Sequence, residues 1–226
     1  MRSLRGFLNR TIFFRSETDT MLTVSMAFSV MMVFIRIGFT GSGTFLFLVW
    51  NLFLAWVPYV LSAWLMLTPG WINNRLKFML VLAIWLLFIP NAFYLLTDLF
   101  HLGYFRGAPL WFDLMMVVSF AWNGLLLGML SVRQMEKIIL GSFPALNEWL
   151  FTGPVMLLNA LGVYIGRYLR FNSWDIITNP FGLVSDIAQL VLHPFRELYA
   201  WGMIGCFAAF MTLIYLTVKR LGKAVG

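Results

Sequence analysis

The sequence has 226 residues, of which 61% are hydrophobic and only 11% are charged, with a formal net charge of +7 and one cysteine. Soluble domains are typically about 45–50% apolar and about 25% charged, so these charges are too few to coat a water-soluble globule. The composition therefore excludes a soluble enzyme, a disulfide-rich secreted scaffold, a disordered chain and an ordinary nucleic-acid binder. It predicts an integral membrane protein.

Six long apolar runs, nearly free of charge, follow one another along the chain. About 20 apolar helical residues cross a hydrocarbon core of about 30 Å, so each run is long enough for one span. The predicted spans are residues 20–38, 45–67, 77–97, 111–132, 149–169 and 199–218. The runs are apolar on every face, which favours helices over barrel strands. The expected fold class is an all-α polytopic transmembrane helix bundle, with a membrane domain at 20–218 between the segments 1–19 and 219–226.

The distribution of basic residues predicts the orientation of these spans. Eleven of the sixteen Lys and Arg residues fall in the N-terminal segment, the loops after the second and fourth spans, and the C-terminal tail. Because Lys and Arg accumulate in cytoplasmic loops, both termini are expected in the cytoplasm, and the expected location is the inner (plasma) membrane. This asymmetry accounts for the high net charge through topology and anionic lipid, without a nucleic-acid partner.

Two short amphipathic segments are expected to lie on the membrane surface. Residues 1–15 carry apolar side chains at near-helical spacing among arginines, which is typical of a helix on the inner surface. In the outer loop at 170–198, Asn179 and Pro180 provide an N-terminal cap and first turn for a helix at about 181–193. This second helix is too short to span and is expected to cover the outer side of the bundle.

Polar residues at the end of the third span recur at helical spacing. Asn91, Tyr94, Asp98 and His101 are three, four and three residues apart, so a helix places them on one face. Pro90 removes a backbone hydrogen bond and predicts a kink just before this face. Polar groups inside spans are costly and commonly mark a functional site or a packing contact.

Other polar residues are expected at the same membrane level. A rise of about 1.5 Å per residue places Asp98, Asp113 and Arg170 near the outer boundary and several asparagines deeper. We call this predicted site the polar cup. Its rim is formed by Asp98, His101, Asp113, Arg167 and Arg170, its floor by Asn51, Asn91, Asn123 and Asn159, and Tyr94, Asn172 and Asp175 are further candidate substrate-binding residues. Glycine pairs at 124/128 and 162/166 have the small-xxx-small spacing of close helix contacts.

Three stretches of the sequence carry a family resemblance. They are Pro90-Asn91-Ala92 with Tyr94, Thr97-Asp98 and His101-Leu102; Trp111-Phe112-Asp113; and residues 166–175 with Asn179-Pro180. With them, the chain resembles the bacterial integral membrane proteins of the "domain of unknown function 1361" family, from the second span to the last. It departs from the pattern at Phe93, where a second proline is expected. The resemblance implies a multi-span membrane protein of about this length and implies no activity.

The first functional hypothesis is a membrane enzyme that acts on, or binds, a lipid headgroup or another anionic substrate at the outer leaflet. Asp98, His101 and Asp113 provide two carboxylates and an imidazole, which suit a divalent-metal site or general acid–base catalysis. Arg167 and Arg170 would hold a phosphate or carboxylate of the substrate. The expected partners are membrane lipids, with a homo-oligomer as a further option.

Two alternatives remain open at this stage. A small transporter or channel would use the asparagines to line a path, although transport sites usually lie near mid-membrane and the charges here do not. A structural subunit would use Asp98, Asp113 and Asp175 only to pair with Arg167, Arg170 and Arg36, so that charges at the boundary are compensated. The sequence therefore locates a candidate site without choosing between enzyme, transporter and scaffold.

Overall fold

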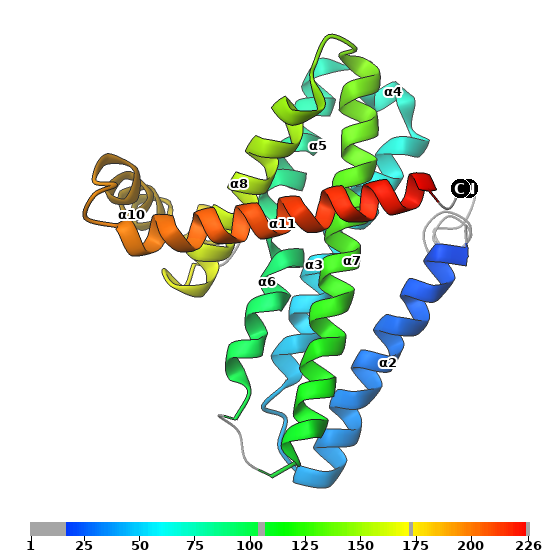
Figure 1. Cartoon of the computed structure of the whole chain (residues 1–226), viewed down its shortest axis with the longest axis vertical. Coiled ribbons are helices and arrows are strands. Elements are labelled where there is room, and N and C mark those ends of the chain that lie inside the picture. Colours follow the sequence, from blue (N-terminus) through cyan, green and yellow to red (C-terminus); the bar gives the residue numbers. More distant parts are fainter. Residues whose placement is uncertain (1–16, 104–106, 172–173, 225–226) are drawn as a thin grey trace.

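The computed structural model describes residues 17–103, 107–171 and 174–224, and these residues form helices and connections without a strand. The elements, coloured along the chain in Figure 1, are α2 (Glu17–Thr40), α3 (Leu46–Leu67), α4 (Pro69–Ile72), α5 (Arg75–Phe88), α6 (Pro90–Thr97), the 3-10 helix η1 (Asp98–His101), α7 (Leu110–Ser142), α8 (Glu148–Arg167), α9 (Asp175–Thr178), α10 (Pro180–Leu192) and α11 (Leu198–Ala224). The all-α prediction is confirmed. The segment predicted as an amphipathic helix at 1–15 lies outside the described residues.

Six helices are long and apolar enough to cross a membrane. They are Glu17–Thr40, Leu46–Leu67, Arg75–His101, Leu110–Ser142, Glu148–Arg167 and Leu198–Gly222. Each contains most or all of one predicted span, so the prediction of six spans is confirmed and the chain is a multi-pass membrane protein. The fourth helix ends at Ser142 rather than at residue 132, because Glu136 is buried there against Arg133 and Lys219 and the helix continues.

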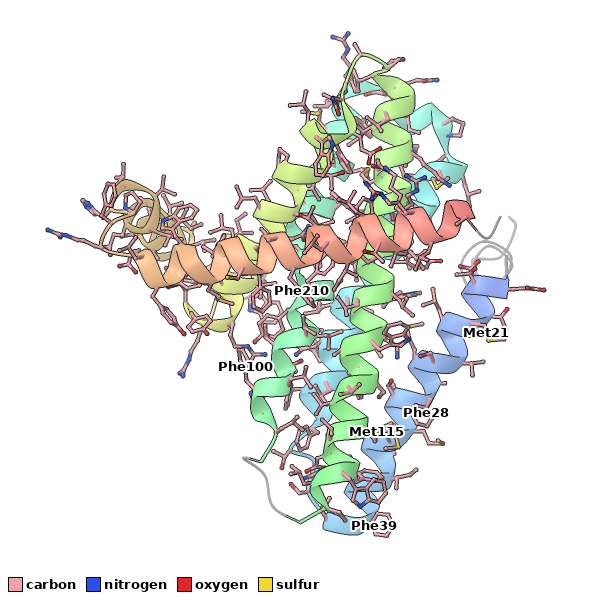
Figure 2. The ribbon with its side chains drawn as sticks, viewed as in Figure 1. Met21, Phe28, Phe39, Phe100, Met115 and Phe210 are labelled. Atoms are coloured by element: carbon pink, nitrogen blue, oxygen red, sulfur yellow. The ribbon has the colours of Figure 1, made fainter. Side chains whose placement is uncertain are left out.

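Large apolar side chains cover the outside of these helices. Figure 2 labels six of them, on α2, η1, α7 and α11: Met21, Phe28, Phe39, Phe100, Met115 and Phe210. Their exposed fractions range from 43% for Phe28 to 80% for Phe39. Such a surface would be unfavourable in water at about 25 cal/mol per Å² of apolar area, and it is the surface expected beside lipid chains.

The short helix α6 is packed closely between α7 and α8, and glycines make this possible. A Cβ atom on Gly124 of α7 would lie 2.4 Å from the Ala92 carbonyl oxygen, and one on Gly162 of α8 would lie 2.5 Å from Pro90 Cγ. The other member of each predicted glycine pair, Gly128 or Gly166, also faces α6. The glycine spacing thus serves close helix packing, as predicted, and its common partner is the helix that carries the polar stripe.

Pro90 begins α6 directly after Ile89, the single residue that separates it from α5. Ile89, between the two helices, keeps helical dihedral angles of φ −60° and ψ −32°, and its N–H still donates to the Trp85 carbonyl. Pro90 then occupies the first position of α6, where a missing N–H costs little. Helical dihedral angles thus persist up to Pro90, and α6 begins one residue before Asn91, while the kink at Pro90 stays a prediction.

The last helix, α11, crosses in front of α7 in Figure 1 and packs antiparallel along α8, since Tyr199 lies beside Tyr168 at one end and Lys219 beside Glu148 at the other. An ion-paired cluster fixes it near its C-terminal end. Lys219 Nζ lies 2.7 Å from Glu136 Oε1 of α7 and 2.7 Å from Glu148 Oε1 of α8. Glu136 also pairs with Arg133, one turn earlier on α7. Three helices are thus joined through the Lys219 ammonium, and the Glu136 residue that it contacts is 1% exposed.

Candidate functional site

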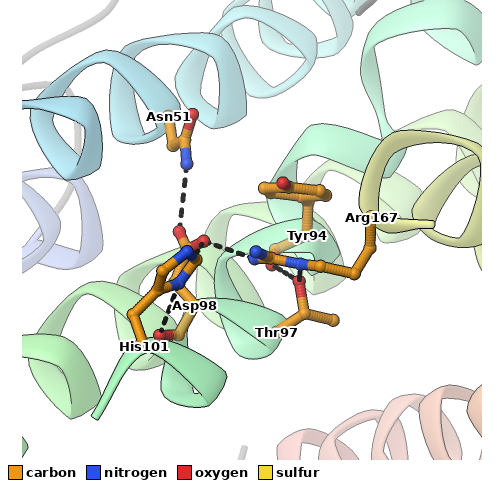
Figure 3. Close-up of polar contacts among 6 residues, drawn as sticks. All are labelled: Asn51, Tyr94, Thr97, Asp98, His101 and Arg167. Atoms are coloured by element: carbon orange, nitrogen blue, oxygen red, sulfur yellow. Dashed lines mark hydrogen bonds and ion pairs between the residues drawn. The ribbon is translucent and has the colours of Figure 1, made fainter. Parts of the chain in front are cut away.

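Asp98, the first residue of η1, lies between three helices. Its side chain is 1% exposed. Asn51 Nδ2 of α3 donates to Oδ2 at 3.0 Å, and an Arg167 terminal nitrogen of α8 donates to Oδ1 at 2.5 Å, as Figure 3 shows. A buried carboxylate is costly unless it is paired and hydrogen-bonded, and here each oxygen has a donor. Asp98 therefore joins α3 and α8 to the end of the polar helix.

Arg167 is held by two further contacts with α6. Its Nε donates to Thr97 Oγ1 at 2.9 Å, and its guanidinium carbon lies 4.4 Å from the centre of the Tyr94 ring (Figure 3). Thr97 Oγ1 in turn donates to the Tyr94 carbonyl at 2.7 Å. A guanidinium that is paired with a carboxylate and stacked on an aromatic ring has a fixed position. The side chain of Arg167 is accordingly only 13% exposed.

His101 stays close to Asp98 but is less buried. Its Nδ1 lies 3.3 Å from the Asp98 carbonyl oxygen and 3.9 Å from Oδ1, and 31% of its side chain is exposed. Its ring centre lies 5.1 Å from that of Phe47 on α3. The 3-10 turn advances about 120° per residue instead of 100°, so the predicted stripe twists after Thr97. Asn91 and Tyr94 consequently face a different space from His101.

Asp113, the third predicted ligand, belongs to a separate ion pair. Its two carboxylate oxygens accept from Arg36 Nε at 2.7 Å and from a terminal Arg36 nitrogen at 3.2 Å, and both side chains are buried. The Arg36 guanidinium also lies over the Phe45 ring at 4.4 Å. Within the described residues, no group of three or more His, Cys, Asp or Glu side chains is placed to hold a metal ion. The structure thus pairs Asp98 with His101 but does not bring Asp113 to them.

The four asparagines of the predicted floor also lie in different places, two in the interior of the bundle and two at one cavity. Asn123 is fully buried and its Nδ2 donates to Ser29 Oγ of α2 at 2.9 Å, while Asn159 Nδ2 donates to the Val155 carbonyl of its own helix. These two asparagines pack the interior of the bundle. Asn51 and Asn91, in contrast, line one cavity together. A single cup with one floor is therefore not formed.

The cavity that contains Asn51 and Asn91 has a volume of about 470 Å³ and was not predicted from the sequence. It lies between α3, α5, α6 and α8, with α9 and α10 on one side. Most of its lining is apolar, as in Leu54, Leu86, Leu158, Ile165, Leu183 and Ile187, and Tyr94 is a further polar lining residue. Tyr94 and Asn51 both contact the Asp98–Arg167 pair, so the cavity ends against that pair. Its volume and lining are those of sites for small apolar molecules.

The remaining predicted residues lie beyond the end of α8. Arg170 is exposed and has a left-handed backbone, with φ +59°. In the sequence, Arg170 lies between Gly166 and Phe171, which both line the cavity. Asp175 begins α9 and accepts from Thr178 Oγ1 at 2.7 Å. Asn172 lies outside the described residues.

Sequence reasoning missed the apolar half of this site. Trp50, Leu158, Leu183 and Ile187 line the cavity, yet nothing in their residue types separates them from the lipid-facing residues around them. Only three-dimensional packing brings α3, α8 and α10 around one space. The chemistry available there is the binding of an apolar group, with amide and phenol groups beside it and the Asp98–Arg167 pair in contact with two of the lining residues.

A family model described as "Protein of unknown function (DUF1361)" matches residues 50–216. This range contains Asp98, Arg167 and the whole cavity lining, from Trp50 to Ile187. No curated protein and no solved structure matches the chain. With three quarters of its length matched by that model, and with the resembling stretches at 90–102, 111–113 and 166–180 inside the match, the chain belongs to the DUF1361 family.

Proposed function

We propose that this protein binds one membrane amphiphile, with the apolar chain in the cavity and an anionic headgroup beside Arg170. The observation that carries the proposal is the cavity itself, which is about 470 Å³ in volume and is lined mainly by Leu and Ile side chains. An apolar cavity in contact with a bilayer is filled most favourably by a lipid chain, because no water has to be accommodated there. Membrane lipids are therefore the proposed ligands.

The charge at the edge of the cavity supports an anionic headgroup. Arg170 is exposed, and its left-handed backbone costs roughly 1–2 kcal/mol relative to a right-handed one. A costly conformation at a residue with an exposed charge is a reason to assign that residue a function. We also propose that Arg170 lies at the outer leaflet of the inner membrane. Eleven of the sixteen basic residues lie in the termini and in the loops after the second and fourth spans, which are expected in the cytoplasm, and Arg170 belongs to a loop on the opposite side.

Binding is favoured over catalysis by the state of Asp98. Both carboxylate oxygens already accept hydrogen bonds from Asn51 and Arg167, and the side chain is 1% exposed. A general base has to reach its substrate within about 2.6–3.2 Å, directly or through one water. Asp98 and Arg167 are therefore proposed to position Tyr94 at the end of the cavity. His101 is more exposed to its surroundings than Asp98 is.

A structural role is the second candidate, and the two ion pairs favour it. Arg36 joins α2 to Asp113 of α7, and Arg167 joins α8 to Asp98. A protein in which these pairs only stabilise the bundle would need no ligand in the cavity. The two candidates therefore differ in whether a lipid occupies the cavity, and a substitution that fills the cavity separates them.

Leu158→Trp is expected to abolish lipid retention, because the indole would occupy the cavity that Leu158 lines. Leu157→Trp is the matched control: Leu157 is 46% exposed and Leu158 is 48% exposed, they are neighbours on α8, and Leu157 does not line the cavity. Native mass spectrometry of detergent-purified protein measures the bound lipid. We expect about one lipid on the wild type and on Leu157→Trp, and none on Leu158→Trp. Equal lipid binding by the two variants would contradict the proposal.

Arg170→Gly is expected to reduce the preference for anionic lipid without loss of stability. Glycine adopts φ +59° freely, so the free energy of unfolding should stay the same or rise by up to about 1 kcal/mol. The preference for phosphatidylglycerol over phosphatidylcholine should fall several-fold in a competition read by native mass spectrometry. Arg170→Lys keeps the charge and should keep most of the preference. A preference unchanged in Arg170→Gly would remove Arg170 from the headgroup site.

A further inference from the structure

The helix α10 presents three different faces, although the sequence predicts only an apolar and a polar one. The first face is directed at the bundle. Leu183 and Ile187 line the cavity, and Leu190 is 3% exposed. These residues are four and three positions apart, so they follow one line along the helix. This face forms part of the cavity wall.

The second face is apolar and exposed. It consists of Phe181, Val184, Val191 and Leu192, whose exposed fractions range from 52% to 89%. At about 100° per residue these side chains occupy one arc of the helix, directly beside the arc of Leu183 and Ile187. Val191, for example, stands one turn after Ile187. The exposed apolar face is therefore continuous with the cavity face.

The third face is polar and exposed. Ser185, Gln189 and His193 are four residues apart and all exposed, so they form a line on the far side from the cavity. A helix with a protein-facing arc, an apolar exposed arc and a polar exposed arc matches three surroundings at once: protein, lipid and water. That combination occurs where a helix lies in the plane of the membrane at its boundary with water.

The helix α10 is capped at its N-terminal end and hydrogen-bonded to α11 near its C-terminal end. Asn179 Oδ1 accepts from the Gly182 N–H at the N-terminal end. Trp201 Nε1 of α11 donates to the Leu190 carbonyl at 3.0 Å near the C-terminal end. With 13 residues, α10 is about 20 Å long and too short to span the hydrocarbon core. The helix is thus held beside the bundle and not through the membrane.

We infer that α10 lies in the lipid–water boundary and that the cavity beneath it opens sideways into the bilayer. Since the exposed apolar arc adjoins the cavity arc, a ligand reaches Leu183 and Ile187 from the lipid and not past Gln189 from water. The ligand is then a bilayer-resident amphiphile that carries an acyl chain, and a water-soluble anion is excluded. This inference rests on the proposed function, to which it adds the ligand class and the route of entry.

The position of α10 is tested by spin labelling in phosphatidylcholine–phosphatidylglycerol vesicles. Cys206, the only cysteine, is exposed and is first replaced in Cys206→Ser. Val184→Cys and Gln189→Cys, both at exposed positions, then each carry one nitroxide. We expect the ratio of oxygen to nickel-chelate accessibility to be at least fivefold higher at 184 than at 189. Equal ratios would place both faces in water and overturn the inference.

The route of entry is tested in the same vesicles with a phosphatidylglycerol that carries a diazirine in its acyl chain. Irradiation should attach the lipid to peptides that contain Leu158 or Ile187, and a dihexanoyl analogue added from water should not reduce this labelling. Displacement by the soluble analogue would overturn sideways entry while lipid binding stands. Absence of cavity labelling, with lipid binding unaffected by Leu158→Trp, would instead overturn the proposed function, whatever the position of α10.

Discussion

Arg167→Met is expected to lower the free energy of unfolding by about 3–5 kcal/mol, because Asp98 would keep a buried charge without its cationic partner. The Asp98 side chain is 1% exposed, and Arg167 supplies the nearest positive charge, 2.5 Å away. Unfolding in detergent, followed by circular dichroism during a titration with denaturant, measures the loss. The reference is Arg170→Met, which removes an exposed arginine three residues later and should change stability by about 0.5 kcal/mol or less.

The double variant Asp98→Leu with Arg167→Met shows what the ion pair is for. Replacing a whole buried pair by apolar side chains is often neutral, so most of the lost stability should return. If the double variant is stable and still binds lipid, the pair serves the fold alone. If it is stable and has lost lipid, Asp98 and Arg167 also shape the end of the cavity. Equal stability of Arg167→Met and Arg170→Met would contradict the buried pair altogether.

Gly124→Ala is expected to destabilise the protein by about 1–3 kcal/mol, the usual range for an overpacked contact. The new methyl group would lie 2.4 Å from the Ala92 carbonyl oxygen and within 3 Å of the Leu95 side chain. Because the obstructing atom belongs to the backbone, α6 and α7 have to separate. The same unfolding measurement in detergent checks this loss.

Gly141→Ala is the matched control, on the same helix and with the same chemical change. Nothing lies within 4 Å of the Cβ that it would add, and alanine favours a helix over glycine by up to about 1 kcal/mol. It should therefore be neutral or stabilising. Similar stabilities of the two variants would mean that α6 and α7 do not approach as closely as Gly124 requires.

The fold was largely predictable because each membrane-spanning helix has to be long and apolar enough to cross the hydrocarbon core and has to form its own backbone hydrogen bonds there. Charge-free length indicates a span, and proline and glycine indicate where it ends, so the six helices start within three residues of the predicted limits. The helix of the fourth span continues beyond the predicted limit of residue 132. Arg133 and Glu136 lie on this continuation, where Glu136 pairs with Arg133 and with Lys219 of α11. Which charged residues pair depends on how the helices pack against one another. The spacing of residues along one helix does not predict that packing.

The same limit applies to the site. The spacing of Asn91, Tyr94, Asp98 and His101 predicted a polar stripe, and these residues lie on α6 and η1. The structural alternative expected Asp98, Asp113 and Asp175 to pair with Arg167, Arg170 and Arg36, but the sequence did not determine that Arg36 pairs with Asp113 and Arg167 with Asp98. Membrane depth alone placed all these charges at one level, and depth does not distinguish two neighbours in the plane of the bilayer. The cavity was missed for a related reason, since its apolar lining resembles the lipid-facing surface.

The contact between Glu136 and Lys219 also has a consequence for the order of synthesis. The two residues are 83 positions apart, so at about 5–20 residues per second roughly 4–17 s pass between their additions to the chain. During that interval Glu136 has Arg133 on its own helix, while Lys219 has not yet been made. The assembly that exists before α11 therefore has two acids in this cluster, Glu136 and Glu148, and one base, Arg133, and Lys219 balances the charge when α11 arrives.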